Sequence, residues 1–221
     1  MSEVCSFSLS HYKYCLELAK RNGYAFLTMS EYASKRNEIA SGEKIIVMRH
    51  DIDHYLTLAT NFANIENTLE IKGTYFVRVH GKYSITSLEG YKILGELRAA
   101  GHELGLHHDC DFASLVDEDP ETSFIRDKLL FESVINKKIC GISSHEPGKS
   151  NFKLTDKDLS KFFLTYQAYS DIFLKDMKYI SDSSSRWREG CMCIHIKNNV
   201  QKLCILTHPI WWFDKSPLEN Y

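Results

Sequence analysis

The sequence predicts an α/β fold built on a parallel sheet. Segments with the apolar spacing of a helix alternate with short apolar runs, and turn residues such as Asn22-Gly23, Gly73 and Gly101 separate them. This alternation is typical of a parallel sheet, open or closed into a barrel, with ligands at the carboxyl ends of the strands. A length of 221 residues suits a single domain with one large core.

The first helix is predicted because Tyr12, Leu16 and Ala19 recur at helical spacing. The predicted helices are 9–21, 28–36, 56–71, 87–100 and 121–136. The predicted strands are 24–27, 45–50, 74–77, 102–107, 141–144, 172–174, 193–196 and 203–206. Thr28 or Ser30 is expected to cap the second helix. After residue 166 the chain shows short strand candidates and few helix signals.

The composition is that of a globular protein: 43% of residues are hydrophobic, 25% are charged, and the formal net charge is −2. With no basic stretch, no nucleic-acid partner is expected. The apolar stretches are too short to span a membrane, and the first 25 residues lack the apolar core of a secretion signal. We therefore expect a cytoplasmic protein without a membrane span, of unknown oligomeric state.

Seven cysteines, an odd number, fit a reducing compartment in which most are small core residues. Cys191 and Cys193 lack the two-residue gap of a redox or zinc pair, so a buried structural role is expected for them. His11, His80 and His195 have no acidic cluster beside them and are also interpreted as structural.

The most informative segment is residues 49–54, Arg-His-Asp-Ile-Asp-His, which follows an apolar run at 45–48. Arg49, Asp51 and Asp53 share one face of the predicted strand because side chains alternate. Two adjacent carboxylates raise each other's pKa, and a bound cation removes that penalty. A helix cap would explain one aspartate, but not two aspartates with two histidines.

Further polar residues follow the other predicted strands, at 107–111, 145–146 and 208. In a parallel array these ends meet at one edge. Imidazole and carboxylate ligands with an open position are typical of a catalytic divalent metal site. Such a metal lowers the pKa of water and polarises a carbonyl. A second carboxylate could then act as base and a histidine as acid.

These motifs resemble those of the NodB-homology polysaccharide deacetylases. Residues 49–53 resemble the aspartate motif of the family, 73–77 its second strand, 101–107 its histidine motif, and 204–208 its closing Leu-x-His motif. The resemblance covers residues 45–211. It implies a distorted or incomplete (β/α) barrel with an N-terminal helical extension, in one deacetylase-like catalytic domain spanning residues 1–221.

Carried over by position, the resemblance implies that Asp51 is the general base and His208 the general acid, with Asp53 and His107 as metal ligands. Asp111 stands where the family has its second histidine, four residues after His107, and is expected to be the third ligand, with His108 or Cys110 as alternatives. A carboxylate there would make the site more anionic and favour a harder metal.

The family's arginine motif is altered here, at residues 144–149. Arg49 or His145 is expected to orient the base in its place. Trp187, in a stretch similar to the family's Asp-and-Trp motif, and Trp211 are expected to contact the substrate, because aromatic planes suit a sugar ring. A core position is the alternative for both tryptophans.

The resemblance implies a metal-dependent hydrolase of a C–N amide bond. The expected reaction is deacetylation of an N-acetylated sugar, or a sugar-containing intermediate, in surface polysaccharide metabolism. Zinc is the expected cofactor, with cobalt, nickel or manganese as alternatives, and a small carbohydrate or glycan-containing molecule is the expected partner. Two other functions remain open: a non-catalytic member of the fold that binds a glycan or partner, and a metal-dependent phosphoesterase.

Overall fold

The computed structural model describes residues 5–147 and 154–214. The helices are α1 (Leu9–Arg21), α2 (Met29–Lys35), α3 (Ala59–Thr68), α4 (Leu88–Ala99), α5 (Phe112–Leu115), α6 (Pro120–Ile135), α7 (Asp171–Leu174) and α8 (Met192–Lys197). The strands are β1 (Ala25–Leu27), β2 (Ile45–Ile52), β3 (Thr74–Val77), β4 (Glu103–Asp109), β5 (Gly141–His145), β6 (Tyr166–Gln167), β7 (Lys178–Ser181) and β8 (Lys202–Thr207). Short 3₁₀ turns form at Leu56–Leu58, Ser160–Phe162 and Pro209–Trp211.

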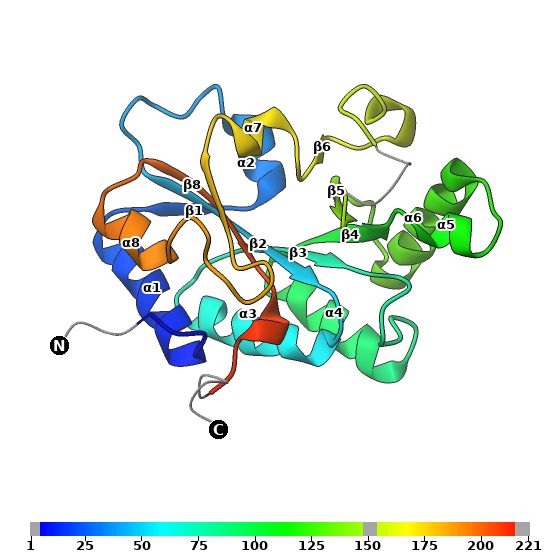
Figure 1. Cartoon of the computed structure of the whole chain (residues 1–221), viewed down its shortest axis with the longest axis horizontal. Coiled ribbons are helices and arrows are strands. Elements are labelled where there is room, and N and C mark those ends of the chain that lie inside the picture. The colour runs from blue at the N-terminus through cyan, green and yellow to red at the C-terminus, as the bar shows by residue number, and fades with distance from the viewer. Residues whose placement is uncertain (1–4, 148–153, 215–221) are drawn as a thin grey trace.

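Within the described residues, eight strands form one curled parallel sheet (Figure 1). Their order is β6-β5-β4-β3-β2-β8-β7, and β1 pairs with the first half of β2. The end strands β6 and β7 do not pair with each other in this order, so the barrel is incomplete. The predicted distorted or incomplete (β/α) barrel is confirmed.

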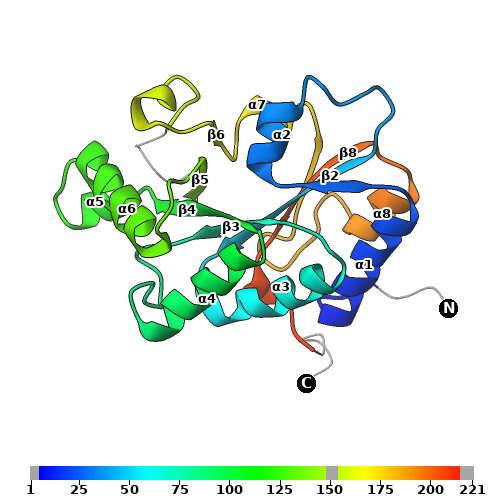
Figure 2. The same ribbon diagram turned by 180° about the vertical axis from the view of Figure 1, so that it is seen from behind.

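The sheet separates two apolar layers. Helices α1, α3 and α4 lie along its outer side, and α2 and α7 lie on the opposite side (Figures 1 and 2). Ile46 and Met48 of β2 belong to the outer layer with Phe62, whereas Val47 packs with Phe76 in the inner layer. Because both faces of β2 are covered, the strand is buried over its whole length, as central parallel strands are.

Local sequence signals set most element boundaries. Thr28 caps α2 with a complete capping box that involves Glu31. Ser87 caps α4 by accepting a hydrogen bond from the backbone N–H of Gly90. The predicted helix 56–71 forms as a 3₁₀ turn followed by α3. No helix in the described ranges has the length and apolar character needed to cross a membrane.

Two predicted strands are wrong: residues 172–174 and 193–196 belong to helices α7 and α8. A short apolar run does not by itself distinguish a strand from a buried helical turn. In α8 the buried residues are Met192, Cys193 and Ile196, which share one helical face. The sheet edge beside β8 is already occupied by β7.

A buried carboxylate joins α1, α3 and the centre of the sheet. Glu66 of α3 is fully buried and accepts hydrogen bonds from the hydroxyls of Tyr12 and Tyr75, each at 2.6 Å. The Nε2 atom of His50 on β2 lies 2.8 Å from Glu66 Oε1. Burial alone would raise the pKa of Glu66, but the His50 imidazole and these hydrogen bonds lower it.

We predict that Glu66→Ala lowers the free energy of unfolding by about 3–5 kcal/mol, because it leaves His50 and two buried hydroxyls without their shared partner. Urea denaturation measures the change. The exposed Glu96 of α4 provides the control, since Glu96→Ala should alter stability by less than about 0.5 kcal/mol. Equal stability of the two variants would contradict the structural role of Glu66.

Candidate metal and catalytic site

The carboxyl ends of β2, β4, β5 and β8 surround one cavity of about 520 Å³. Six of the residues singled out from the sequence line it: Asp51, Asp53, His107, His145, His208 and Trp211. The parallel sheet places them together because every strand ends at the same edge. Leu206 and Tyr169 add apolar surface to the cavity.

Arg49 and Asp51 form a buried ion pair at the bottom of this cavity. Arg49 Nε lies 2.9 Å from Asp51 Oδ1, and Nη2 lies 2.7 Å from Oδ2. Ser143 donates a hydrogen bond to the same carboxylate at 3.1 Å. Burial would raise the pKa of Asp51, but the charge and the hydrogen bonds of Arg49 hold it well below its ordinary value. The carboxylate is therefore ionised and fixed in orientation.

Three donor atoms converge beside Asp51. His107 Nε2 is 3.1 Å from Asp53 Oδ1, and His145 Nε2 is 3.9 Å from the same oxygen. These three atoms all lie within 4.8 Å of one another. Two imidazoles and a carboxylate form a ligand set suited to a divalent transition metal with open coordination positions.

The other ring nitrogens of the two histidines are held by partners outside this group. His107 Nδ1 lies 3.0 Å from the carbonyl oxygen of Ser143, and His145 Nδ1 lies 3.2 Å from Asp109 Oδ1. An N–H at each Nδ1 leaves Nε2 with its lone pair toward the cavity. This is the arrangement of second partners that metal-binding histidines use.

Asp109 is in turn held by Arg78, whose Nε donates to Asp109 Oδ2 at 3.0 Å. Burial would raise the pKa of Asp109, but hydrogen bonds with His145 and Arg78 lower it to about 2. Arg78 also donates to the backbone carbonyl of Asp53 at 3.3 Å. The chain Arg78–Asp109–His145 thus fixes the orientation of one candidate ligand, His145, and Arg78 also holds the backbone of another, Asp53.

His208 forms a second dyad on the cavity wall, with Asp182. Its Nδ1 lies 2.5 Å from Asp182 Oδ1, and its backbone N–H donates to the same carboxylate. Trp212 also donates to Asp182, at 2.8 Å. Burial would lower the pKa of His208, but the hydrogen bond and charge of Asp182 outweigh it, so the pKa is raised above its ordinary value.

Asp111, expected as the third ligand, lies elsewhere. Strand β4 ends at Asp109, and Asp111 is the exposed residue before α5, in a neighbouring hollow with Arg78 and His80. Residues four apart are neighbours on one face of a helix, but His107 lies on a strand and Asp111 on the turn after it, so their side chains are not brought together. His145 takes its place beside Asp53 and His107.

The two tryptophans differ in position. Trp211 lines the cavity, whereas Trp187 is not among its lining residues and stacks on Phe7, with ring centroids 6.3 Å apart. Of the two residues expected to orient Asp51, Arg49 contacts its carboxylate, whereas His145 lies beside Asp53 and Asp109. Of the altered arginine motif, Gly148 and Lys149 lie outside the described residues.

Asp109, Asp182 and Ser143 have no predicted role from the sequence. Asp109 lay within a noted cluster, and Asp182 within the stretch similar to the Asp-and-Trp motif. What was missing was the pairing, because Asp182 and His208 are 26 residues apart and come from different strand ends. Because metal-binding histidines commonly pair with a carboxylate, Asp109 could have been raised as a candidate from its place beside His107, whereas the only sequence signal for Asp182 was the stretch at 179–187.

Comparisons with known proteins identify the fold. No protein-family model and no curated protein sequence matches the chain. Among solved structures, the Streptococcus pyogenes deacetylase PplD in complex with acetate is similar, with 16% identity over 72% of this chain and 70% of that one and a TM-score of 0.51. The chitin deacetylase of the fungal pathogen Colletotrichum lindemuthianum shares 16% identity over 78% and 80% of the two chains, with a TM-score of 0.52.

A third similar structure is a mutant of BA3943 from Bacillus anthracis, described as a CE4 family pseudoenzyme with restored enzymatic activity. It shares 13% identity over 76% of this chain and 57% of that chain, with a TM-score of 0.50. These likenesses show that the chain has the fold of the polysaccharide deacetylases, in agreement with the motifs of the sequence.

We predict that Asp109→Asn weakens divalent-metal binding by about 10–100-fold, because it removes the charge that orients and polarises His145. Titration of metal-free protein with zinc in competition with a chelating dye measures the affinity. His145→Ala should weaken binding further. Asp111→Asn is the matched control and should bind as the wild type does; a large loss in that variant would return Asp111 to the ligand set.

Proposed function

We propose that this protein is a metal-dependent hydrolase that removes the acetyl group from an N-acetylated sugar or sugar-containing intermediate. One observation carries the proposal: a fixed carboxylate, Asp51, and a fixed imidazole, His208, line the same cavity as the three donor atoms of Asp53, His107 and His145. Base, acid and metal ligands are the groups that amide hydrolysis needs.

The metal site is proposed from its donor set. Asp53, His107 and His145 would hold the ion, and Asp111 is not included. When bound, a divalent cation supplies Lewis acidity, which polarises a carbonyl and lowers the pKa of water. Zinc suits two imidazoles and a carboxylate, with cobalt, nickel or manganese as alternatives.

The protein's own residues divide the proton transfers between them. Asp51 is ionised and accepts a proton from the attacking water. Arg49 holds the Asp51 carboxylate in its orientation at the cavity. His208 carries a proton and donates it to the nitrogen that leaves with the sugar. Asp182 holds the His208 ring through Nδ1, so that Nε2 is the nitrogen free to deliver the proton.

The cavity favours a carbohydrate substrate. Its volume of about 520 Å³ suits a sugar unit, and it combines polar side chains with the aromatic rings of Trp211 and Tyr169. Two proteins of the same fold are described as a deacetylase and a chitin deacetylase. By this analogy we propose that the reaction belongs to surface polysaccharide metabolism. The cytoplasm is the expected location, since seven free cysteines fit a reducing compartment.

A non-catalytic glycan-binding member of the fold is the second candidate, because one similar structure derives from a protein described as a pseudoenzyme. The sequence arguments for it are the aspartate at position 111 and the altered arginine motif at residues 144–149. His145 beside Asp53 and His107 supplies a three-residue ligand set without Asp111, which weakens the first of these arguments. A phosphoesterase remains the third candidate, and assaying phosphate release beside acetate release distinguishes it.

We predict that Asp51→Asn lowers acetate release from N-acetylglucosamine oligomers by about 10²–10⁴-fold while metal content is retained, because the variant keeps the volume of the side chain but not its basicity. Acetate is measured by a coupled enzymatic assay, and metal by elemental analysis. Circular dichroism controls for folding, since Arg49 loses its charged partner. Unchanged turnover would remove Asp51 from the mechanism.

The pH dependence should report on His208. Because its pKa is raised and it acts in its protonated form, kcat/KM should fall as the pH rises through that pKa. Asp182→Asn removes the charge that raises the pKa, so the alkaline limb should move to lower pH. The exposed Asp176 offers a control, and Asp176→Asn should leave the profile unchanged. If the alkaline limb of kcat/KM is not shifted in Asp182→Asn, that limb reports the titration of a group other than His208.

A further inference from the structure

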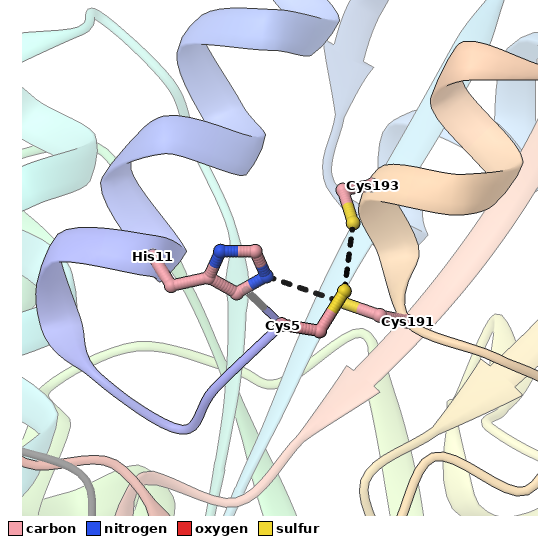
Figure 3. A group of neighbouring side chains, drawn as sticks. All are labelled: Cys5, His11, Cys191 and Cys193. Atoms are coloured by element: carbon pink, nitrogen blue, oxygen red, sulfur yellow. Dashed lines mark hydrogen bonds between the residues drawn. The ribbon is translucent and has the colours of Figure 1, made fainter. Parts of the chain in front are cut away.

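A second cluster of ligand-type side chains lies away from the cavity, between helices α1 and α8 (Figure 3). It consists of Cys5, His11, Cys191 and Cys193, and one ligand atom from each lies within 4.8 Å of every other. Cys5 Sγ is 3.4 Å from Cys193 Sγ, and His11 Nε2 is 3.2 Å from Cys191 Sγ. None of the four takes part in the proposed reaction.

The fold brings these residues together from the two ends of the chain. Cys5 precedes α1, and His11 lies in the first turn of that helix. Cys191 immediately precedes α8 and Cys193 lies in its first turn, so both face α1. His11, Cys191 and Cys193 are buried, whereas Cys5 is exposed and closes the cluster from outside.

The separations match those within a tetrahedral zinc site. With Zn–S near 2.3 Å and Zn–N near 2.0–2.1 Å, neighbouring ligand atoms are about 3.5–3.8 Å apart. The Cys5–Cys193 and His11–Cys191 separations, 3.4 and 3.2 Å, fall slightly below that range, so small outward shifts would admit an ion. A disulfide is not present, since its sulfur atoms lie near 2.05 Å and all seven cysteines are free.

We propose that Cys5, His11, Cys191 and Cys193 bind a structural Zn²⁺ ion in a closed Cys₃His site. Four protein ligands complete a tetrahedral shell and leave no position for a substrate, which is the signature of a structural rather than a catalytic zinc. Three sulfur ligands also select zinc over the harder divalent metals. The proposed site at the cavity, with nitrogen and oxygen donors from three residues, has the ligand set of a catalytic site instead.

A fifth thiol borders the cluster. Cys15, one helical turn after His11, is fully buried, and its Sγ lies 3.5 Å from His11 Nε2. A thiol in this position can donate a hydrogen bond to a coordinated thiolate, as outer-shell groups of metal sites do. It also excludes water from the inner side of the cluster.

The ion would fasten the start of the chain beside the proposed acid. Phe7, two residues after Cys5, packs against Trp212 with ring centroids 5.2 Å apart, and its carbonyl accepts a hydrogen bond from the N–H of Phe213. Trp212 in turn donates to Asp182, the partner of His208. Zinc binding would therefore stabilise the segment that packs behind the acid dyad.

Cobalt substitution tests the proposal. Cobalt bound to thiolates gives a sulfur-to-metal charge-transfer absorption, and the ligand group at the cavity contains no sulfur. The band should appear in the wild type and in His107→Ala, and should be lost in Cys191→Ser and Cys193→Ser. Cys140→Ser, a half-buried cysteine outside the cluster, is the matched control and should retain it.

Zinc content gives an independent measurement on protein purified under reducing conditions. Relative to the wild type, Cys191→Ser should lose one zinc equivalent per chain and Cys140→Ser none. Should Cys191→Ser not fold, a mercurial thiol reagent added to the wild-type protein should release one zinc equivalent to an indicator dye, even when a chelator has first emptied the cavity site.

Three results would overturn the proposal: a cobalt spectrum without the thiolate band, no thiol-dependent zinc release from the wild type, or a disulfide between Cys5 and Cys193 in the purified chain. None of them depends on acetate release, so a failure here leaves the proposed hydrolase untouched. Conversely, a protein that binds zinc at Cys5, His11, Cys191 and Cys193 but releases no acetate would support the structural zinc site and not the proposed hydrolase.

Discussion

The buried pair of Arg49 and Asp51 is the constraint on which the site depends. Both side chains are removed from water at the end of the central strand, where desolvation is costly and only close, bidentate contact offsets it. Phe76 and Tyr169 lie against the guanidinium, at 5.6 and 4.5 Å from their ring centroids. The apolar inner layer of the sheet thus ends at this pair, and the cavity lined by polar side chains begins at Asp51.

Around this pair, His107, His145 and His208 are each held at the nitrogen that does not face the cavity. Backbone and carboxylate acceptors from β5, β4 and the segment after β7 take up the Nδ1 atoms of His107, His145 and His208. The same device therefore serves two purposes. At two histidines it would present lone pairs to the proposed cation, and at the third, beside a charged acceptor, it would keep a proton available for the proposed acid step.

Periodicity was sufficient to predict a parallel sheet, open or closed, and the resemblance to the polysaccharide deacetylases implied its form as an incomplete barrel. The strand-end motifs gathered Asp51, Asp53, His107 and His208 at one edge, because a parallel sheet fixes where strand ends lie. These sequence signals failed where local sequence is ambiguous or contacts are distant. Short apolar runs became the helices α7 and α8, and the extrapolation of a fixed four-residue spacing selected Asp111. The cluster of Cys5, His11, Cys191 and Cys193 was missed because its members are up to 188 residues apart.

The hydrogen bonds of Glu66 bear on where the minimal domain begins. The recognisable motifs start at residue 45, so a truncated protein designed from the motifs alone would lack residues 1–44. Tyr12 belongs to the part that would be removed, and β1 pairs with the first half of β2. A shortened chain would open the packing around a fully buried anion and uncover an edge of the central strand, so it would be prone to aggregate rather than to fold as a compact barrel.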